Sequence, residues 1–183
     1  RELSGSDRYA FDQLYWHFFY HRHNDFWKAQ AFKRLTPLVA STEMLVCGED
    51  LGMIPASVPE VMNKLQILSL EIERMPKSLQ REFSDMFNLP YHSVCTTSTH
   101  DMTPLRNWWK EDPEKTQRYY NHVLQRIGEA PDECTAEIVA QIISNHLKTR
   151  SMLTIIPLQD WFAMDDSIKR KDIESERINV PAN

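Results

Sequence analysis

Short hydrophobic runs alternate along the chain with longer segments of helical periodicity. Four runs rich in Val, Ile, Leu and Thr stand out, at residues 44–48, 65–72, 93–98 and 152–158. Each is too short to form the core of a helix, and the intervals are long enough for crossover helices. The runs are apolar on both faces, as strands are when helices cover them or when they close into a barrel. The pattern therefore predicts an α/β fold of about four parallel strands joined by right-handed connections.

Helical segments fill the intervals between these runs. A long helix is expected over residues 7–35, with Ser6 or Asp7 as its cap. Shorter helices are expected at 58–64, 78–87 and 103–110, and longer ones at 113–127 and 131–147, with Pro113 and Pro131 in their first turns. Residues 169–176 should form a solvated loop or a helix end. The first helix has an aromatic face, which is expected to be core rather than a groove for a partner but could be uncovered if the chain is only part of a longer protein. Its members are Phe11, Tyr15, Phe18 and Phe19.

Composition narrows the class of protein. The 183 residues carry 21 Lys and Arg against 26 Asp and Glu, a formal charge of −5, so a nucleic-acid partner is not expected. Hydrophobic residues at 42% and charged residues at 26% are typical of a globular fold. The sequence contains no apolar run of the ~20 residues that span a bilayer and no signal-peptide pattern at its start, so a soluble protein without a membrane partner is expected.

The cysteines and histidines do not indicate a disulfide or a metal site. The odd number and wide spacing of Cys47, Cys95 and Cys134 argue against disulfides or zinc and favour the cytoplasm. Cys47 and Cys95 fall in predicted strands and are expected to be buried. On the first helix only two of the residues His17, His21 and His23 share a face, so packing rather than a metal site is expected there.

Polar side chains follow three of the four hydrophobic runs. Glu49 and Asp50 come after the first run, His100 and Asp101 after the third, and Gln159 and Asp160 after the fourth; the second run ends in Glu71, Glu73 and Arg74. In a parallel barrel the carboxyl ends of the strands meet at one mouth, so a cluster of carboxylates is predicted there. Polar residues also flank many buried strands simply because the chain there meets water.

Such a cluster suits more than one chemistry. Glycoside chemistry needs one protonated carboxyl as general acid and others that stay ionised. Metal-dependent barrel lyases and isomerases instead use carboxylates to hold a cation such as Mg²⁺. A non-catalytic carbohydrate-binding piece is a third interpretation, and the spacing of the residues leaves all three open.

Several segments together resemble the 4-alpha-glucanotransferases, also called amylomaltases, of the alpha-amylase-like clan. They are CGEDLGMIP at 47–55, TSTHDMTPLRNWW at 97–109, the pair Gln159 and Asp160, and RINVP at 177–181, and the wording is most similar to the plant cytosolic type. The resemblance covers nearly the whole chain and implies the C-terminal half of a (β/α)8 TIM barrel. Residues 1–183 would be a single partial domain, with 1–43 a helix entering the strand that ends at Glu49 and 44–183 strands five to eight.

The resemblance implies roles for individual residues. Glu49 would be the catalytic acid/base, Asp101 the stabiliser of the transition state, and His100 a ligand of a sugar hydroxyl. The family's nucleophile lies in an RxDH motif that does not occur here, so it is expected outside this chain, in the missing N-terminal half of the barrel. Met102 stands where many bacterial members have Asn, so contacts around Asp101 are expected to differ.

Residue chemistry adds to these roles. Burial beside apolar residues would favour the protonated form of Glu49, whereas Asp101 should stay ionised opposite a developing positive charge. Asp50, Gln159 and Asp160 could bind sugar hydroxyls, or the last two could instead help to close the barrel. Trp108 could stack on a sugar, and the alternative is that both Trp108 and Trp109 belong to the core.

The activity implied is retaining transfer of α-1,4-glucan or glucosyl units. The expected partners are maltose, maltooligosaccharides and α-glucan polysaccharide, and no metal or organic cofactor is expected. Cleavage would proceed by double displacement, with a sugar rather than water as acceptor.

Residues 1–183 on their own are expected to show no glucanotransferase activity, because the covalent glycosyl intermediate needs the absent nucleophile. Half a barrel would also leave strand edges and an apolar interior unpaired. Incubation with maltotriose and a search for longer maltooligosaccharides checks this. Sustained disproportionation would place the nucleophile within these residues and end the half-barrel interpretation.

Overall fold

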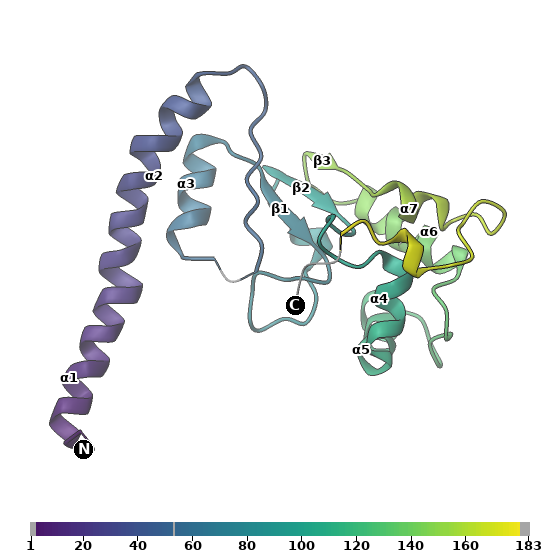
Figure 1. Cartoon of the computed structure of the whole chain (residues 1–183), viewed down its shortest axis with the longest axis horizontal. Helices are drawn as coiled ribbons and strands as arrows, with labels where there is room; N and C mark the ends of the chain where they lie inside the picture. Colours follow the sequence, from purple (N-terminus) through teal and green to yellow (C-terminus); the bar gives the residue numbers. More distant parts are fainter. Residues whose placement is uncertain (1–2, 53, 180–183) are drawn as a thin grey trace. The chain divides into compact units, whose positions relative to one another are not determined.

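The computed structural model describes residues 3–52 and 54–179. The chain divides into two compact units, Arg1–Ser69 (unit 1) and Leu70–Asn183 (unit 2). Figure 1 shows the elements of both units along the chain. Within the described residues, no helix combines the length and apolar character that a membrane span requires.

Unit 1 begins with a long helical segment. It consists of α1 (Gly5–Trp16), a π-helical stretch (His17–Arg22) and α2 (His23–Ala40). The cap is Ser4, whose hydroxyl accepts the backbone N–H of Asp7 at 3.2 Å, so the predicted cap at Ser6 or Asp7 is wrong by two or three residues. None of the described residues of this segment is buried.

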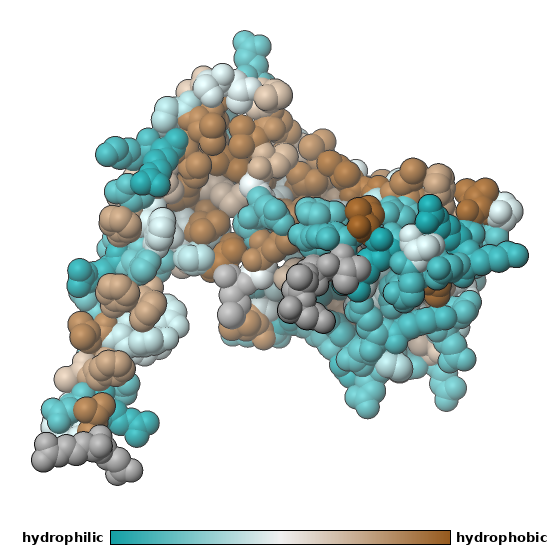
Figure 2. Space-filling model, in the orientation of Figure 1, coloured by the Kyte–Doolittle hydropathy of each residue, from teal (hydrophilic) through white to brown (hydrophobic). Residues whose placement is uncertain are grey.

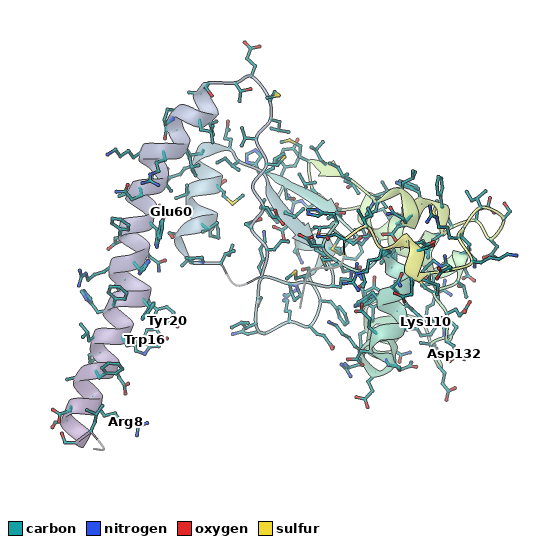
Figure 3. The ribbon with its side chains drawn as sticks, in the orientation of Figure 1. Arg8, Trp16, Tyr20, Glu60, Lys110 and Asp132 are labelled. Carbon is teal, nitrogen blue, oxygen red and sulfur yellow. The ribbon has the colours of Figure 1, made fainter. Side chains whose placement is uncertain are left out.

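Most aromatic residues of this segment are exposed, so its aromatic face is uncovered in the described structure and does not pack into a core; Phe32 is half-buried. The exposed members are Phe11, Tyr15, Phe18 and Phe19, together with Trp16, Tyr20, Phe26 and Trp27. These rings contact mainly one another. Trp16 and Tyr20, labelled in Figure 3, have ring centroids 4.4 Å apart.

Helix α3 (Ser57–Leu65) confirms the helix predicted at 58–64 and packs against α2. Val61 and Met62 are buried, and Glu60 bridges Lys28 of α2 at 2.5 Å and Lys64 at 2.8 Å. In Figure 2 hydrophobic residues gather over the end of α2 and over α3, and Figure 3 labels Glu60 beside α2.

The first hydrophobic run does not form a full strand in the described structure. It makes one parallel bridge, between Cys47 and Leu68, in which the Gly48 N–H donates to Leu68 O at 2.8 Å. Met44 and Leu45 are exposed, which leaves the run without the packing that would extend it. Cys47 is exposed as well, so its predicted burial is wrong, whereas that of Cys95 is confirmed.

In the part of the chain that the structure describes, three strands form a parallel sheet in the order β1-β2-β3. They are β1 (Ser69–Ile72), β2 (Ser93–Thr96) and β3 (Leu153–Thr154), and Val94 pairs with Leu153 in the register of the last two. The second run is shorter than predicted because α3 extends to Leu65 and Gln66 ends the helix with φ 55°. The fourth run is cut short because Pro157 precedes α7 (Leu158–Phe162).

Helices of unit 2 cover one main core. They are α4 (Leu105–Glu111), α5 (Pro113–Arg118) with a π-helical extension (Tyr119–Val123), and α6 (Ala136–Leu147). Pro113 occupies the first turn of α5 as predicted. Pro131 does not start α6, because Thr135 provides its cap and accepts the Ile138 N–H at 3.3 Å.

The helix predicted at 78–87 is absent from the described residues. A single 3-10 turn (Met86–Asn88) stands there. The Asp85 side chain accepts the Phe87 N–H at 3.2 Å and the Asn88 side-chain amide at 2.6 Å. Such local bonds offer the backbone an alternative to the helix. A second 3-10 turn (Glu174–Glu176) lies near the C-terminal end.

A buried acid stands at the carboxyl end of β1. Glu73 accepts a hydrogen bond of 2.5 Å from the hydroxyl of Tyr119, and both side chains are enclosed by the core. Burial raises the pKa of Glu73 from its ordinary value near 4.5 to about 7. Since the neutral form is the one that burial favours, its stabilising contribution is complete below about pH 4.5 and is lost as the pH rises through about 7.

Glu73→Gln should therefore become more stable relative to the unsubstituted protein as the pH rises from 5 to 8. The amide keeps an acceptor for Tyr119 and does not titrate, so the gain approaches about 3 kcal/mol for a pKa shift of this size. Urea unfolding of the complete protein, followed by fluorescence of the neighbouring tryptophans, measures the difference. Parallel stability curves for the two proteins across this pH range would contradict the assignment.

Candidate active site

The loop after β2 carries His100 and Asp101 at the carboxyl end of the sheet. Both side chains are exposed, and His100 Nε2 lies 3.2 Å from Asp101 Oδ2. The other oxygen, Oδ1, accepts a short hydrogen bond from the side-chain amide of Asn179. The carboxylate is thus oriented by a neighbour on each oxygen while staying open to solvent.

Asn179 is a site residue that the sequence reasoning missed. It lies in the RINVP segment, 78 positions after Asp101. This segment is one of those that resemble the family, but the resemblance assigned no role to Asn179. The sequence signal that could have identified Asn179 is an amide side chain within a motif shared with the family. That its hydrogen-bond partner is Asp101 can be seen only in the folded structure.

A hollow of about 70 Å³ lies beside this loop. Its lining includes Ser98, Thr99, His100, Met102, Gln159 and Ile178. Gln159 reaches it from α7, and its side-chain amide donates to Glu176 O at 3.2 Å. The structure therefore brings two of the predicted site residues, His100 and Gln159, to this hollow, and a third, Asp101, lies against His100.

Asp160 lies beneath this surface rather than on it. It is 1% exposed, and both carboxylate oxygens accept hydrogen bonds: Oδ2 from the Thr97 hydroxyl at 2.6 Å and Oδ1 from the Leu105 N–H at 3.1 Å. Burial raises its pKa above the ordinary range, although both hydrogen bonds favour the charged form. Both carboxylate oxygens of Asp160 thus bind groups of the protein itself.

Arg74 approaches the same loop from the end of β1. It is 7% exposed; its Nε donates to Thr97 O at 3.1 Å, and a second guanidinium nitrogen donates to Thr103 O. Its guanidinium carbon lies 5.3 Å from the centroid of the Trp108 ring. Burial lowers the pKa of Arg74 to about 10, which leaves the group charged at neutral pH.

Trp108 is a core residue in this structure. It is 7% exposed, and its ring meets Phe83 and Tyr119 edge-on as well as Arg74. Trp109 is buried beside it. The packing alternative therefore applies to both tryptophans, and the predicted sugar-stacking face of Trp108 is covered.

Helix α4 also holds the C-terminal segment that delivers Asn179. Arg106 forms a buried ion pair with Glu176 at 2.7 Å and donates to Arg170 O at 2.8 Å, while Asn107 donates to Glu174 at 2.9 Å. Residues 169–176 were predicted to be solvated. This prediction is wrong for Glu176, which is buried and paired with Arg106.

Unit 1 carries the other two predicted residues. Glu49 is exposed and Asp50 is buried. An apolar groove of about 430 Å³ runs past them, lined by side chains that include Trp27, Leu35, Val61 and Met62. Glu49 also lines this groove, but its side chain is exposed, so the burial predicted for it is absent in the described structure. Among residues 3–52 and 54–179, no group of three or more His, Cys, Asp or Glu is placed to hold a metal ion.

Comparison with known proteins identifies the family. A sequence profile of glycoside hydrolase family 77, the 4-alpha-glucanotransferases, matches residues 2–183. The chain belongs to this family. A solved amylomaltase from Streptococcus agalactiae, in complex with acarbose, superposes with a TM-score of 0.55 at 19% identity over 74% of this chain and 25% of that chain. This likeness supports the fold as part of the TIM barrel of that enzyme class.

Two curated family members show how much of the family this chain represents. It is 39% identical to the rice 4-alpha-glucanotransferase DPE2 over 93% of this chain and 18% of the rice protein. It is 29% identical to a 4-alpha-glucanotransferase of Chlamydia trachomatis over 84% of this chain and 29% of that protein. The chain therefore spans less than a third of the length of these relatives.

Proposed function

We propose that this chain is part of an enzyme that transfers α-1,4-glucan or glucosyl units to a sugar or glucan acceptor with retention of configuration. Family membership across residues 2–183 is the observation that carries the proposal. It favours transfer over the metal-dependent lyase or isomerase and the non-catalytic alternative. The acarbose in the streptococcal amylomaltase supports a glucan-like substrate for this chain.

Asp101 would stabilise the charge that develops on the sugar. Its carboxylate is exposed at the carboxyl end of β2, and Asn179 and His100 each approach one of its oxygens. A fixed anion facing the anomeric carbon lowers the energy of an oxocarbenium-like transition state without reorganising during the reaction. His100 would donate a hydrogen bond to a hydroxyl of the same ring.

Glu49, which belongs to unit 1, would act as the acid/base. The side chain is exposed, so it is accessible to the glycosidic oxygen of a bound glucan. It would first protonate the leaving group and then deprotonate the acceptor hydroxyl. Asp50 and Gln159 remain candidates for sugar hydroxyls.

The nucleophile would come from another part of the polypeptide, and the two units would belong to one barrel domain. Maltose, maltooligosaccharides and α-glucan are the proposed donors and acceptors.

The three cysteines are free, which supports a reducing, cytoplasmic location.

Glu49→Gln in the complete protein should remove nearly all transfer while glucan still binds. Loss of a general acid/base costs on the order of 100- to 10,000-fold in rate. The assay follows maltotriose into longer and shorter products, and binding is measured separately by calorimetry. Glu60→Gln, which changes a carboxylate on α3 of the same unit, serves as the control and should leave transfer unchanged. More than a tenth of the activity remaining in Glu49→Gln would count against its role.

Asp101→Asn should lower turnover with similar severity, because the amide keeps the shape of the side chain but loses the charge opposite the developing cation. The measurement is kcat and KM for maltotriose, with Asp132→Asn, an exposed carboxylate of unit 2, as the matched control. If KM rose while kcat stayed at the level of the control, Asp101 would be a binding residue only.

A further inference from the structure

The loop that carries Asp101 is held from below at both of its ends. Residues 97–105 leave β2 and enter α4, and within this span His100 and Asp101 are exposed while Thr97 is 2% exposed. The exposed part of the loop is thus short and is bounded by buried anchor points. Two buried groups of opposite charge provide the anchors.

Asp160 joins the two ends of the loop through one carboxylate. Oδ2 accepts the Thr97 hydroxyl at the start, and Oδ1 accepts the Leu105 N–H at the end. Pro104, the residue that precedes α4, supplies no side-chain cap, so a side chain 55 positions away satisfies this N–H at the start of the helix. Because a carboxylate is small and rigid, the two ends are held at a fixed separation.

Arg74 also connects the start and the end of the loop, by donating hydrogen bonds to two of its backbone carbonyls. Its guanidinium donates to Thr97 O and to Thr103 O, and the planar group is itself held over Trp108. A guanidinium offers its donors in a fixed fork, so it fixes direction as well as distance. Arg74 and Asp160 also attract each other electrostatically, which offsets part of the cost of burying each charge.

We propose that Asp160 and Arg74 are positioning residues that fix the loop so that Asp101 meets the reacting sugar. The inference rests on the proposed function and assigns Asp160 a role other than binding sugar, since both of its oxygens are occupied and buried. Buried charges contribute little net stability compared with apolar side chains of similar volume. A geometric role explains why charged groups stand at both ends of this loop.

The test compares two buried threonines in the complete protein. Thr97→Val removes the hydroxyl that donates to Asp160 and keeps the shape of the side chain. Thr116→Val is the matched control: Thr116 is 3% exposed, and its hydroxyl donates to Trp109 O at 2.8 Å at the other end of α4. Both variants lose one buried hydrogen bond, but only Thr97 touches the loop.

Thr97→Val, Asp160→Asn and Arg74→Lys should each lower kcat on maltotriose by about 10- to 100-fold, the cost of a displacement of about 1 Å at a catalytic group. KM should change much less. Thr97→Ser should restore kcat because it restores the hydroxyl. Adding Thr97→Val to Asp160→Asn should lower kcat by less than the product of the two separate losses, since both changes act on the same contact. Amide exchange of residues 98–103 should be faster in Thr97→Val than in Thr116→Val.

Each result bears on the proposal. Equal losses of kcat in Thr97→Val and Thr116→Val would overturn the proposal, because general destabilisation would then be the cause. A kcat near that of the unsubstituted protein in Thr97→Val, Asp160→Asn and Arg74→Lys would also overturn it. If Asp160→Asn fails to fold, the Thr97→Val and Thr97→Ser pair decides. If the unsubstituted protein shows no transfer, the proposed function fails on its own, and the exchange comparison alone decides whether the anchors fix the loop.

Discussion

The Asp160 carboxylate is the interaction on which the local order of unit 2 depends. It satisfies a hydroxyl at the end of β2 and an N–H at the start of α4 from its own position on α7. The end of β2, the start of α4 and the distant helix α7 therefore share one buried charge. Taking that charge out of water costs free energy, and only complete hydrogen bonding and a nearby cation make it tolerable. Arg74 is that cation, and it uses its own donors on the same loop.

The position of Asp101 follows from this buried layer. Thr97 is drawn inward by both buried charges, and the chain then passes over them before α4 begins. Helix α4 in turn holds the C-terminal segment through Arg106 and Glu176, which brings Asn179 to the carboxylate of Asp101. The exposed acid is therefore oriented by Asn179, which α4 helps to hold, and by its neighbour His100.

Sequence patterns predicted those elements whose local signals and tertiary surroundings agree. The apolar run at β2 lies in the middle of the sheet and is buried throughout, so burial and periodicity indicate the same strand. Pro113 starts α5 because Asp112 precedes it as a cap. At Pro131 the same signal was misleading, because Thr135 provides the cap instead. The first run failed for a different reason: a strand needs neighbours, and it has only one bridge in the described residues, at Cys47.

Within the site, periodicity could place charged residues at strand ends but could not separate those that face the solvent from those that lie beneath. Asp101 and Asp160 look equivalent in sequence, since each follows a hydrophobic run. The difference lies in hydrogen-bond supply: Asp160 has an N–H and a hydroxyl directed at it from inside the fold, whereas Asp101 has partners only at the surface. Because those donors come from positions 55 to 78 residues away, only the folded chain assigns one acid to the surface and the other to the layer beneath it.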